Sequence, residues 1–334
     1  IIAASEENME LFQQDFQLNR AYAIIKSRLN AEGGSVKNIV QNTFSEFGIK
    51  VNDTLTYKSL YQLMEVTASV AKLQSDFHSV SPFIFELYAI INKKSELKDR
   101  HRFYHLSILN LLAITQFRNK KFAASMRFAK ELEVEIQKDN NLHYKRFAER
   151  LTTLKALNYN YTGKPRVAIE LLTEFKERSL DAQLLLIMCL FQQEDFSEAY
   201  QIIKNLRHSD TWYEKKMGWV WVVKKNLIEI LVLTELDKLD LVLVRLQQFK
   251  RKFSKQLQER GEDRVLTFLK LISRYYENPK QVITQEFKEE VENSFEWLGK
   301  EQEDVFVMSF YAWLKAKMEN ENLYAVTLKL VGHK

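Results

Sequence analysis

The feature that most constrains this chain is a pattern of two consecutive helical hairpins in residues 142–207. Each hairpin reads as a long helix, a short turn and a second helix, with apolar residues at the three- and four-residue spacing of one helix face. In the first turn, Gly163 is placed to end one helix and Pro165 to begin the next. A single hairpin leaves an apolar side uncovered, so each pair must pack on the pair before it.

The same pattern extends in both directions from this stretch. The 334 residues include only 8 Gly and 3 Pro, which leaves room for few loops. In the first predicted helix we expect Met9, Phe12, Phe16 and Leu18 to share the core-facing side. The predicted helices are 5–30, 35–47, 55–73, 81–91, 98–118, 121–138, 142–161, 165–178, 180–193, 196–207, 211–236, 239–258, 261–276, 280–298, 302–318 and 321–331.

No stretch has the alternating pattern of a β-strand, and no linker rich in Pro, Gly or Ser divides the chain. The length exceeds what one compact core usually holds, whereas a stacked array grows along one axis. We therefore expect an all-α, right-handed superhelical solenoid of about six or seven antiparallel hairpins. Residues 1–96 would form N-terminal hairpins continuous with a regular array in 97–334.

The hairpin at 142–178 carries small and large residues at the spacing of a known repeat. Ala156, Tyr159, Ala168 and Leu172 place small side chains where two helices cross and large ones in the gap beside them. This pattern resembles the tetratricopeptide (TPR) family. The neighbouring units fit less well, because Ile187 stands at a small-residue position and Gln116 at the aromatic one. The matching part, residues 98–207, therefore looks like a divergent, TPR-like α-solenoid.

The resemblance implies a non-catalytic scaffold for protein–protein interaction, in which first helices line a concave groove that binds a peptide or helix of a partner protein still to be identified. Positions carried over from the repeat pattern give the expected groove residues. They are Asn110, Ile114, Phe117, Arg118, Arg150, Thr153, Asn160, Tyr161 and Gln192, with Leu184, Met188 and Phe191 beside them.

Carboxylates are plentiful, but no arrangement of residues in the sequence singles out a catalytic pair or a metal site. His101 and His105 lie one helical turn apart, but Arg102 stands where a zinc protease motif has Glu, and no third ligand is near in sequence. Two solvent-facing or capping histidines are the favoured interpretation. Cys189, the single cysteine, lies in an apolar run where its thiol would stay protonated. The sequence thus predicts no enzyme, no cofactor and no metal site.

An alternative function is nucleic-acid binding through two basic stretches, residues 212–226 and 245–260. The first contains three of the five tryptophans among four lysines, a mixture suited to base stacking and phosphate contact. Helical spacing instead favours Trp packing between helices and an ordinary charged helix face. Nucleic acid is therefore the less favoured partner.

The longest apolar run, residues 184–191, is too short to span a bilayer, and no secretory signal opens the chain. A cytoplasmic location is expected. The chain begins with Ile1 instead of Met, from which we expect that leading residues are missing; a removed targeting segment and a further domain stay open, as does the oligomeric state.

Overall fold

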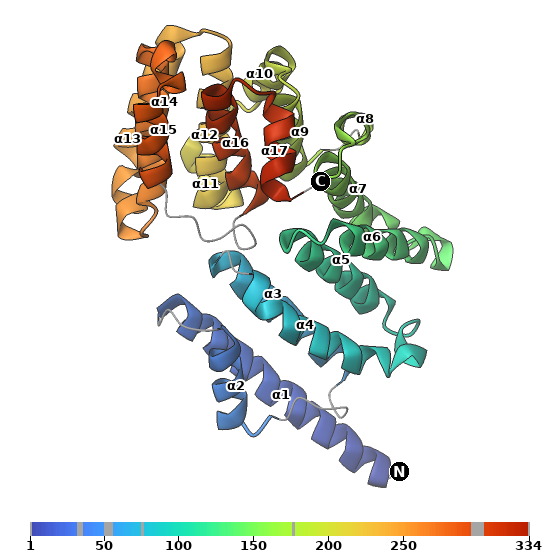
Figure 1. Ribbon diagram of the computed structural model, residues 1–334. Coiled ribbons are helices and arrows are strands. Elements are labelled where there is room, and N and C mark those ends of the chain that lie inside the picture. Colours follow the sequence, from blue (N-terminus) through green and yellow to red (C-terminus); the bar gives the residue numbers. More distant parts are fainter. Residues whose placement is uncertain are drawn as a thin grey trace. The chain divides into compact units, whose positions relative to one another are not determined.

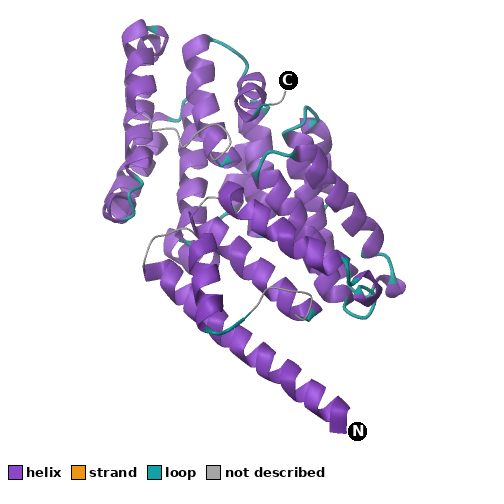
Figure 2. Cartoon of the chain, turned by 60° about the horizontal axis from the view of Figure 1, so that its bottom comes forward, coloured by secondary structure: helices purple, strands orange, loops and turns teal. Residues whose placement is uncertain are grey.

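The computed structural model describes residues 2–31, 36–49, 56–74, 77–175, 178–294 and 304–332. Within these ranges every regular element is a helix, so the prediction of an all-α fold is confirmed there (Figure 2). Contacts between residues divide the chain into two compact units, Ile1–Leu154 (unit 1) and Lys155–Lys334 (unit 2). The boundary falls inside a helix near residue 154.

Unit 1 is built from helix pairs that follow one another along the chain (Figure 1). α1 packs on α2 and α3, α3 packs on α4 and α5, and α5 packs on α6. The bounds are α1 Ile2–Ala31, α2 Val36–Glu46, α3 Tyr57–Gln74, α4 Phe77–Asn92, η1 Ser95–Leu97, α5 Arg102–Arg118, α6 Phe122–Glu135, η2 Asp139–Asn141 and α7 Tyr144–Asn160, the last of which continues into unit 2.

Unit 2 has one continuous hydrophobic core that draws on its early and late helices alike. α9 packs on α8, α10, α12 and α17, and α12 packs on α11 and α13. The bounds are α8 Pro165–Glu174, α9 Leu180–Gln192, α10 Phe196–Asn205, α11 Asp210–Met217, α12 Trp219–Glu235, α13 Leu239–Glu259, α14 Asp263–Glu277, η3 Pro279–Ile283, α15 Gln285–Ser294, α16 Val305–Glu319 and α17 Leu323–Val331.

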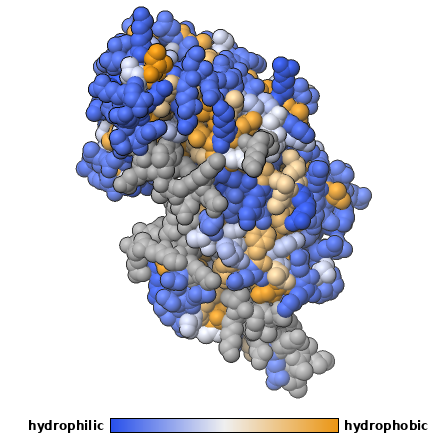
Figure 3. Space-filling view, viewed as in Figure 1, coloured by the Kyte–Doolittle hydropathy of each residue, from blue (hydrophilic) through white to orange (hydrophobic). Residues whose placement is uncertain are grey.

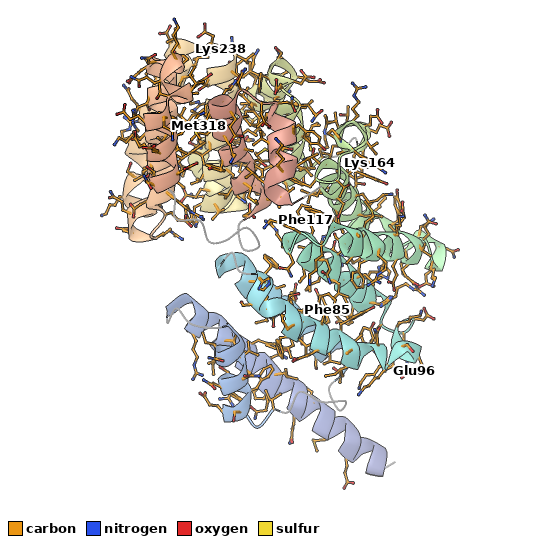
Figure 4. The ribbon with its side chains drawn as sticks, in the orientation of Figure 1. Phe85, Glu96, Phe117, Lys164, Lys238 and Met318 are labelled. Atoms are coloured by element: carbon orange, nitrogen blue, oxygen red, sulfur yellow. The ribbon has the colours of Figure 1, made fainter. Side chains whose placement is uncertain are left out.

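Six helix pairs are joined by the same tight turn. In each, one residue adopts the left-handed conformation, and the amide after it bonds to the carbonyl five residues back, which is the Schellman pattern of helix ends. Only two of the six left-handed residues are glycine: they are Lys120, Gly163, Glu194, Asp237, Gly261 and Asn320. The closing amides belong to Lys121, Lys164, Asp195, Lys238, Glu262 and Glu321; Figure 4 labels Lys164 and Lys238. A common turn thus recurs in both units.

Three sequence predictions differ from the structure. The helix predicted at 211–236 is broken by Gly218, whose φ of 87° ends α11 and begins α12. The helix predicted at 280–298 is a short η3 followed by α15, and its end lies outside the described residues. The helix predicted to begin at Ser81 begins at Phe77 instead, with Pro82 inside it.

The side chains expected to anchor the first helix are also corrected. Met9, Phe12 and Phe16 are exposed, whereas Leu18 of the same predicted set is buried. The buried face of α1 is made by Leu18, Ala21, Tyr22 and Ile25. At 100° per residue, these positions lie nearly opposite to Met9, Phe12 and Phe16, so both sets cannot face one core.

Candidate functional site

The expected groove positions of unit 2 are covered by the C-terminal helix pair. Asn160, Tyr161 and Gln192 have at most 1% of their surface exposed. Gln192 accepts a hydrogen bond from Asn160 Nδ2 at 2.6 Å and donates from Nε2 to Ser309 Oγ of α16 at 2.7 Å. Tyr324 of α17 donates its hydroxyl proton to the Asn160 carbonyl. A peptide therefore finds no open surface at these three residues.

Leu184, Met188 and Phe191, which flank that expected groove, are buried as well. They lie on α9, which packs against α8, α10, α12 and α17. Cys189 on the same helix is fully buried, and burial raises the pKa of its thiol to about 12. α9 is thus a core helix of unit 2 and presents no groove.

The expected groove positions of unit 1 are more open. Ile114 is 37% exposed, Arg150 is exposed, and Thr153 is half-buried. Arg118 is half-buried, with its guanidinium 5.8 Å from the centre of the Phe77 ring. Asn110 and Phe117 are buried; the Phe117 ring packs 5.6 Å from Phe122 at the hairpin turn.

A row of aromatic and arginine side chains crosses α3, α5 and α7, each of which is the first helix of a hairpin in the predicted pattern. The rings of Tyr61 on α3 and Tyr104 on α5 are 5.4 Å apart, and Phe103 lies 5.5 Å from Tyr104. The guanidinium of Arg146 lies 4.3 Å from the centre of the Phe103 ring, and that of Arg150 lies 5.8 Å from Phe147. We call Tyr61, Phe103, Tyr104, Arg146 and Arg150 the aromatic–arginine row.

The hydroxyl of Tyr61 marks where three helices converge in this row. Burial raises the pKa of Tyr61, and the nearby Glu65 carboxylate raises it further. Ser107 of α5 and Arg150 of α7 act in the opposite direction. Groups from α3, α5 and α7 thus lie within electrostatic reach of one phenol, while both arginines of the row stay exposed to solvent.

The paired histidines belong to a packed cluster beside the row. His105 is buried, which corrects the expectation that it faces solvent, and its Nδ1 lies 3.1 Å from the Tyr57 hydroxyl. The Tyr57 ring stacks on His101 at 5.7 Å. Burial lowers the pKa of His105, outweighing the opposing effect of Glu135. Both imidazoles thus pack against one tyrosine.

An ion-pair network surrounds two buried residues, Arg102 of α5 and Glu135 of α6. Arg102 contacts Glu135 at 2.9 Å and Asp99 at 2.6 Å, and it also pairs with Asp139. Lys138 reaches the other oxygen of Glu135 at 2.7 Å. Within the described ranges, no three His, Cys, Asp or Glu side chains are grouped so that they could hold a metal ion.

Several basic residues in the two stretches of the alternative function are paired with carboxylates. Lys225 contacts Asp210 at 3.2 Å and Glu229 at 3.1 Å. Further pairs join Arg245 to Glu229 and Lys252 to Glu214. These contacts neutralise part of the charge that phosphates would need.

The tryptophans of the first stretch are not arranged as one stacking platform. Trp221 is buried beside Tyr213, and Trp219 is half-buried with Arg260 over its ring at 4.5 Å. Trp212 is the most exposed of the three, and its ring stacks on His208 at 3.9 Å. The expected packing of tryptophans between helices is therefore found at Trp219 and Trp221.

No helix in the described part of the chain is both long and apolar enough to cross a membrane. On the face shown in Figure 3, the described residues are mainly hydrophilic, with separate hydrophobic patches. Comparison of the chain with family models, with curated protein sequences and with solved structures finds no match.

Proposed function

We propose that this chain is a non-catalytic, TPR-like scaffold that binds a peptide or short helix of a partner protein on the first helices of unit 1. The aromatic–arginine row is the observation that carries this proposal. The recurring Schellman turn supports a repeated two-helix unit, arranged as a right-handed superhelix. The expected groove positions of unit 2 are covered, as seen at Asn160, Tyr161 and Gln192, so we assign the binding surface to unit 1.

The chemistry of the row favours a ligand with carboxylates beside an apolar side chain. Tyr and Arg are enriched among residues that dominate binding energy at interfaces. Arg146 and Arg150 are exposed, and a guanidinium resting on a ring can still donate its edge N–H groups to a carboxylate. The half-buried Tyr61 and Tyr104 offer flat apolar surface next to them.

Ile114 extends this surface along α5. It is ten residues beyond Tyr104, a distance of about 15 Å in a helix. An extended peptide covers that span with about five residues. We therefore expect an acidic segment of at least that length, with an apolar residue at one end near Ile114 and carboxylates near the arginines.

A library of random twelve-residue peptides, selected against the full chain, tests this proposal. The peptides that are enriched should be acidic and should bind with a Kd in the micromolar range, as measured by fluorescence anisotropy. Arg146→Glu and Arg150→Glu should each weaken binding about tenfold, because one close charge contact is worth about 1.4 kcal/mol. Lys250→Glu, on α13 of unit 2, is the matched control.

Enriched peptides whose affinity is unchanged by both substitutions would contradict the assignment to this row. Loss of binding in the Lys250→Glu control as well would indicate a non-specific effect of net charge.

The nucleic-acid alternative makes a separate prediction. Binding through phosphates would retard single-stranded DNA in a gel at low salt and would weaken steeply as salt rises. The carboxylate partners of Lys225, Arg245 and Lys252 argue against it. A retarded band that survives Arg146→Glu and Arg150→Glu but is lost with Lys250→Glu would favour that alternative over the scaffold.

A further inference from the structure

α1 has an exposed apolar stripe on the side that faces away from unit 1. Met9, Phe12 and Phe16 are 63%, 72% and 55% exposed. The N-terminal half of α1, which carries this stripe, projects beyond α2 (Figures 1 and 2). Three large apolar side chains in one row, more than half exposed, are unusual on a monomer surface and typical of an interaction site.

The spacing of the stripe is that of a coiled-coil seam. Met9, Phe12, Phe16, Asn19 and Ala23 follow one another at intervals of three, four, three and four residues, and all five are exposed. A narrow stripe with this period pairs with one other helix and not with a broad core. A single polar residue in such a seam, here Asn19, restricts the register of the pair.

Two exposed charges of opposite sign flank the same edge of this stripe. Glu6 lies one turn before Met9, and Arg20 lies one turn after Phe16. The guanidinium of Arg20 is held on this edge by the rings of Phe16 at 5.9 Å and Phe47 at 5.5 Å. The stripe is therefore acidic at one end and basic at the other.

We propose that the stripe binds the same stripe of a second copy of this chain, with the two α1 helices antiparallel. This arrangement places Phe12 and Phe16 of each chain against those of the other. It also brings Glu6 of each chain next to Arg20 of the other. A parallel pair would leave Glu6 and Arg20 about 21 Å apart along the interface, because fourteen residues separate them.

The mass of the full chain in solution tests the dimer. Light scattering after gel filtration should give twice the chain mass at about 100 μM protein. Phe12→Glu should weaken dimerisation at least tenfold while the circular dichroism spectrum stays unchanged, because Phe12 contacts solvent in the single chain. Val134→Glu, at a residue of unit 1 that is 61% exposed, should leave the dimer intact. A wild-type chain that is monomeric at this concentration overturns the proposal and assigns the stripe to a different molecule.

Charge exchange tests the antiparallel orientation. Glu6→Arg alone and Arg20→Glu alone each place like charges together in a homodimer, so both variants should dissociate more readily. An equimolar mixture of the two variants should form a heterodimer with about wild-type affinity, because both contacts then join opposite charges. A mixture that associates no better than either variant alone overturns the antiparallel arrangement.

Discussion

The hydroxyl groups of Tyr161 and Ser309 share a hydrogen bond of 3.1 Å, although 148 residues separate them in the sequence. Gln192 Nε2 donates to both oxygens, at 3.3 Å to Tyr161 and 2.7 Å to Ser309. Burial raises the pKa of Tyr161, which favours the protonated phenol that can donate in this network. This polar network attaches α16 to α9 and to the turn after α7.

Ser309→Ala should lower the free energy of unfolding by about 1–3 kcal/mol, because it leaves the Tyr161 hydroxyl and the Gln192 amide with fewer partners in a buried site. Urea unfolding followed by circular dichroism measures the change. Ser254→Ala removes an exposed hydroxyl bonded to the Lys250 carbonyl and should change stability by less than about 0.5 kcal/mol. Equal effects of the two substitutions would contradict a structural role for the network.

The Schellman turns predict opposite changes in stability for substitutions at Gly163 and at Lys120. Gly163 has a φ of 81°, so Gly163→Ala should destabilise the protein by about 1–2 kcal/mol, and Gly163→Asn by less. Lys120 has a φ of 56° in the corresponding turn of unit 1. Lys120→Gly should raise stability by about 0.5–1 kcal/mol, because a side chain in this conformation is strained. Thermal unfolding of the three variants measures the order; destabilisation by Lys120→Gly would refute the argument.

Stability should fall between about pH 7 and pH 5.5 because of His105. Burial lowers the pKa of His105 in the folded state. As the pH drops below the ordinary histidine range, the unfolded chain takes up a proton that the folded chain does not, which favours unfolding.

His105→Asn keeps a polar group near Tyr57 without this titration. Its free energy of unfolding should decrease less between pH 7 and pH 5.5 than that of the wild type, as measured in urea. An identical decrease in both proteins would assign the effect to other groups.

Cys189 should resist thiol reagents in the folded protein. Its side chain is fully buried, and at pH 8 a thiol with a pKa of about 12 is almost entirely protonated. Reaction with a chromogenic disulfide should be at least 100-fold slower in buffer than in 6 M urea. Rapid reaction of the native chain would show that α9 opens frequently.

Helices and several buried anchors follow directly from local pattern. The small residues Ala156, Ala168 and Ala199 are buried, as the crossing of two helices requires. The recurring turn is recognisable where glycine occupies it, as at Gly163, but not at Lys120 or Glu194, because Lys and Glu rarely adopt a left-handed conformation. The helix break at Gly218 was not predicted, because the apolar periodicity continues across this residue.

The candidate site was less predictable, because burial depends on contacts between distant segments. Nothing near Asn160 or Gln192 in sequence indicates that α16 and α17 cover them. The aromatic–arginine row had a partial local signal in the Arg102–His105 segment, where Phe103 and Tyr104 adjoin the paired histidines. Its arginines come from α7, some forty residues later, so their placement required the fold.

Glu194, in the turn between α9 and α10, accepts hydrogen bonds from the Leu323 amide at 3.1 Å and from Asn322 Nδ2 at 3.0 Å. The first amide of the last helix is therefore anchored to a turn in the early part of unit 2. Open helical arrays lose their terminal repeats first, because an end repeat has only one neighbour. In unit 2, α17 contacts both α9 and α16, so we expect it to unfold together with the rest of the unit instead of separating first.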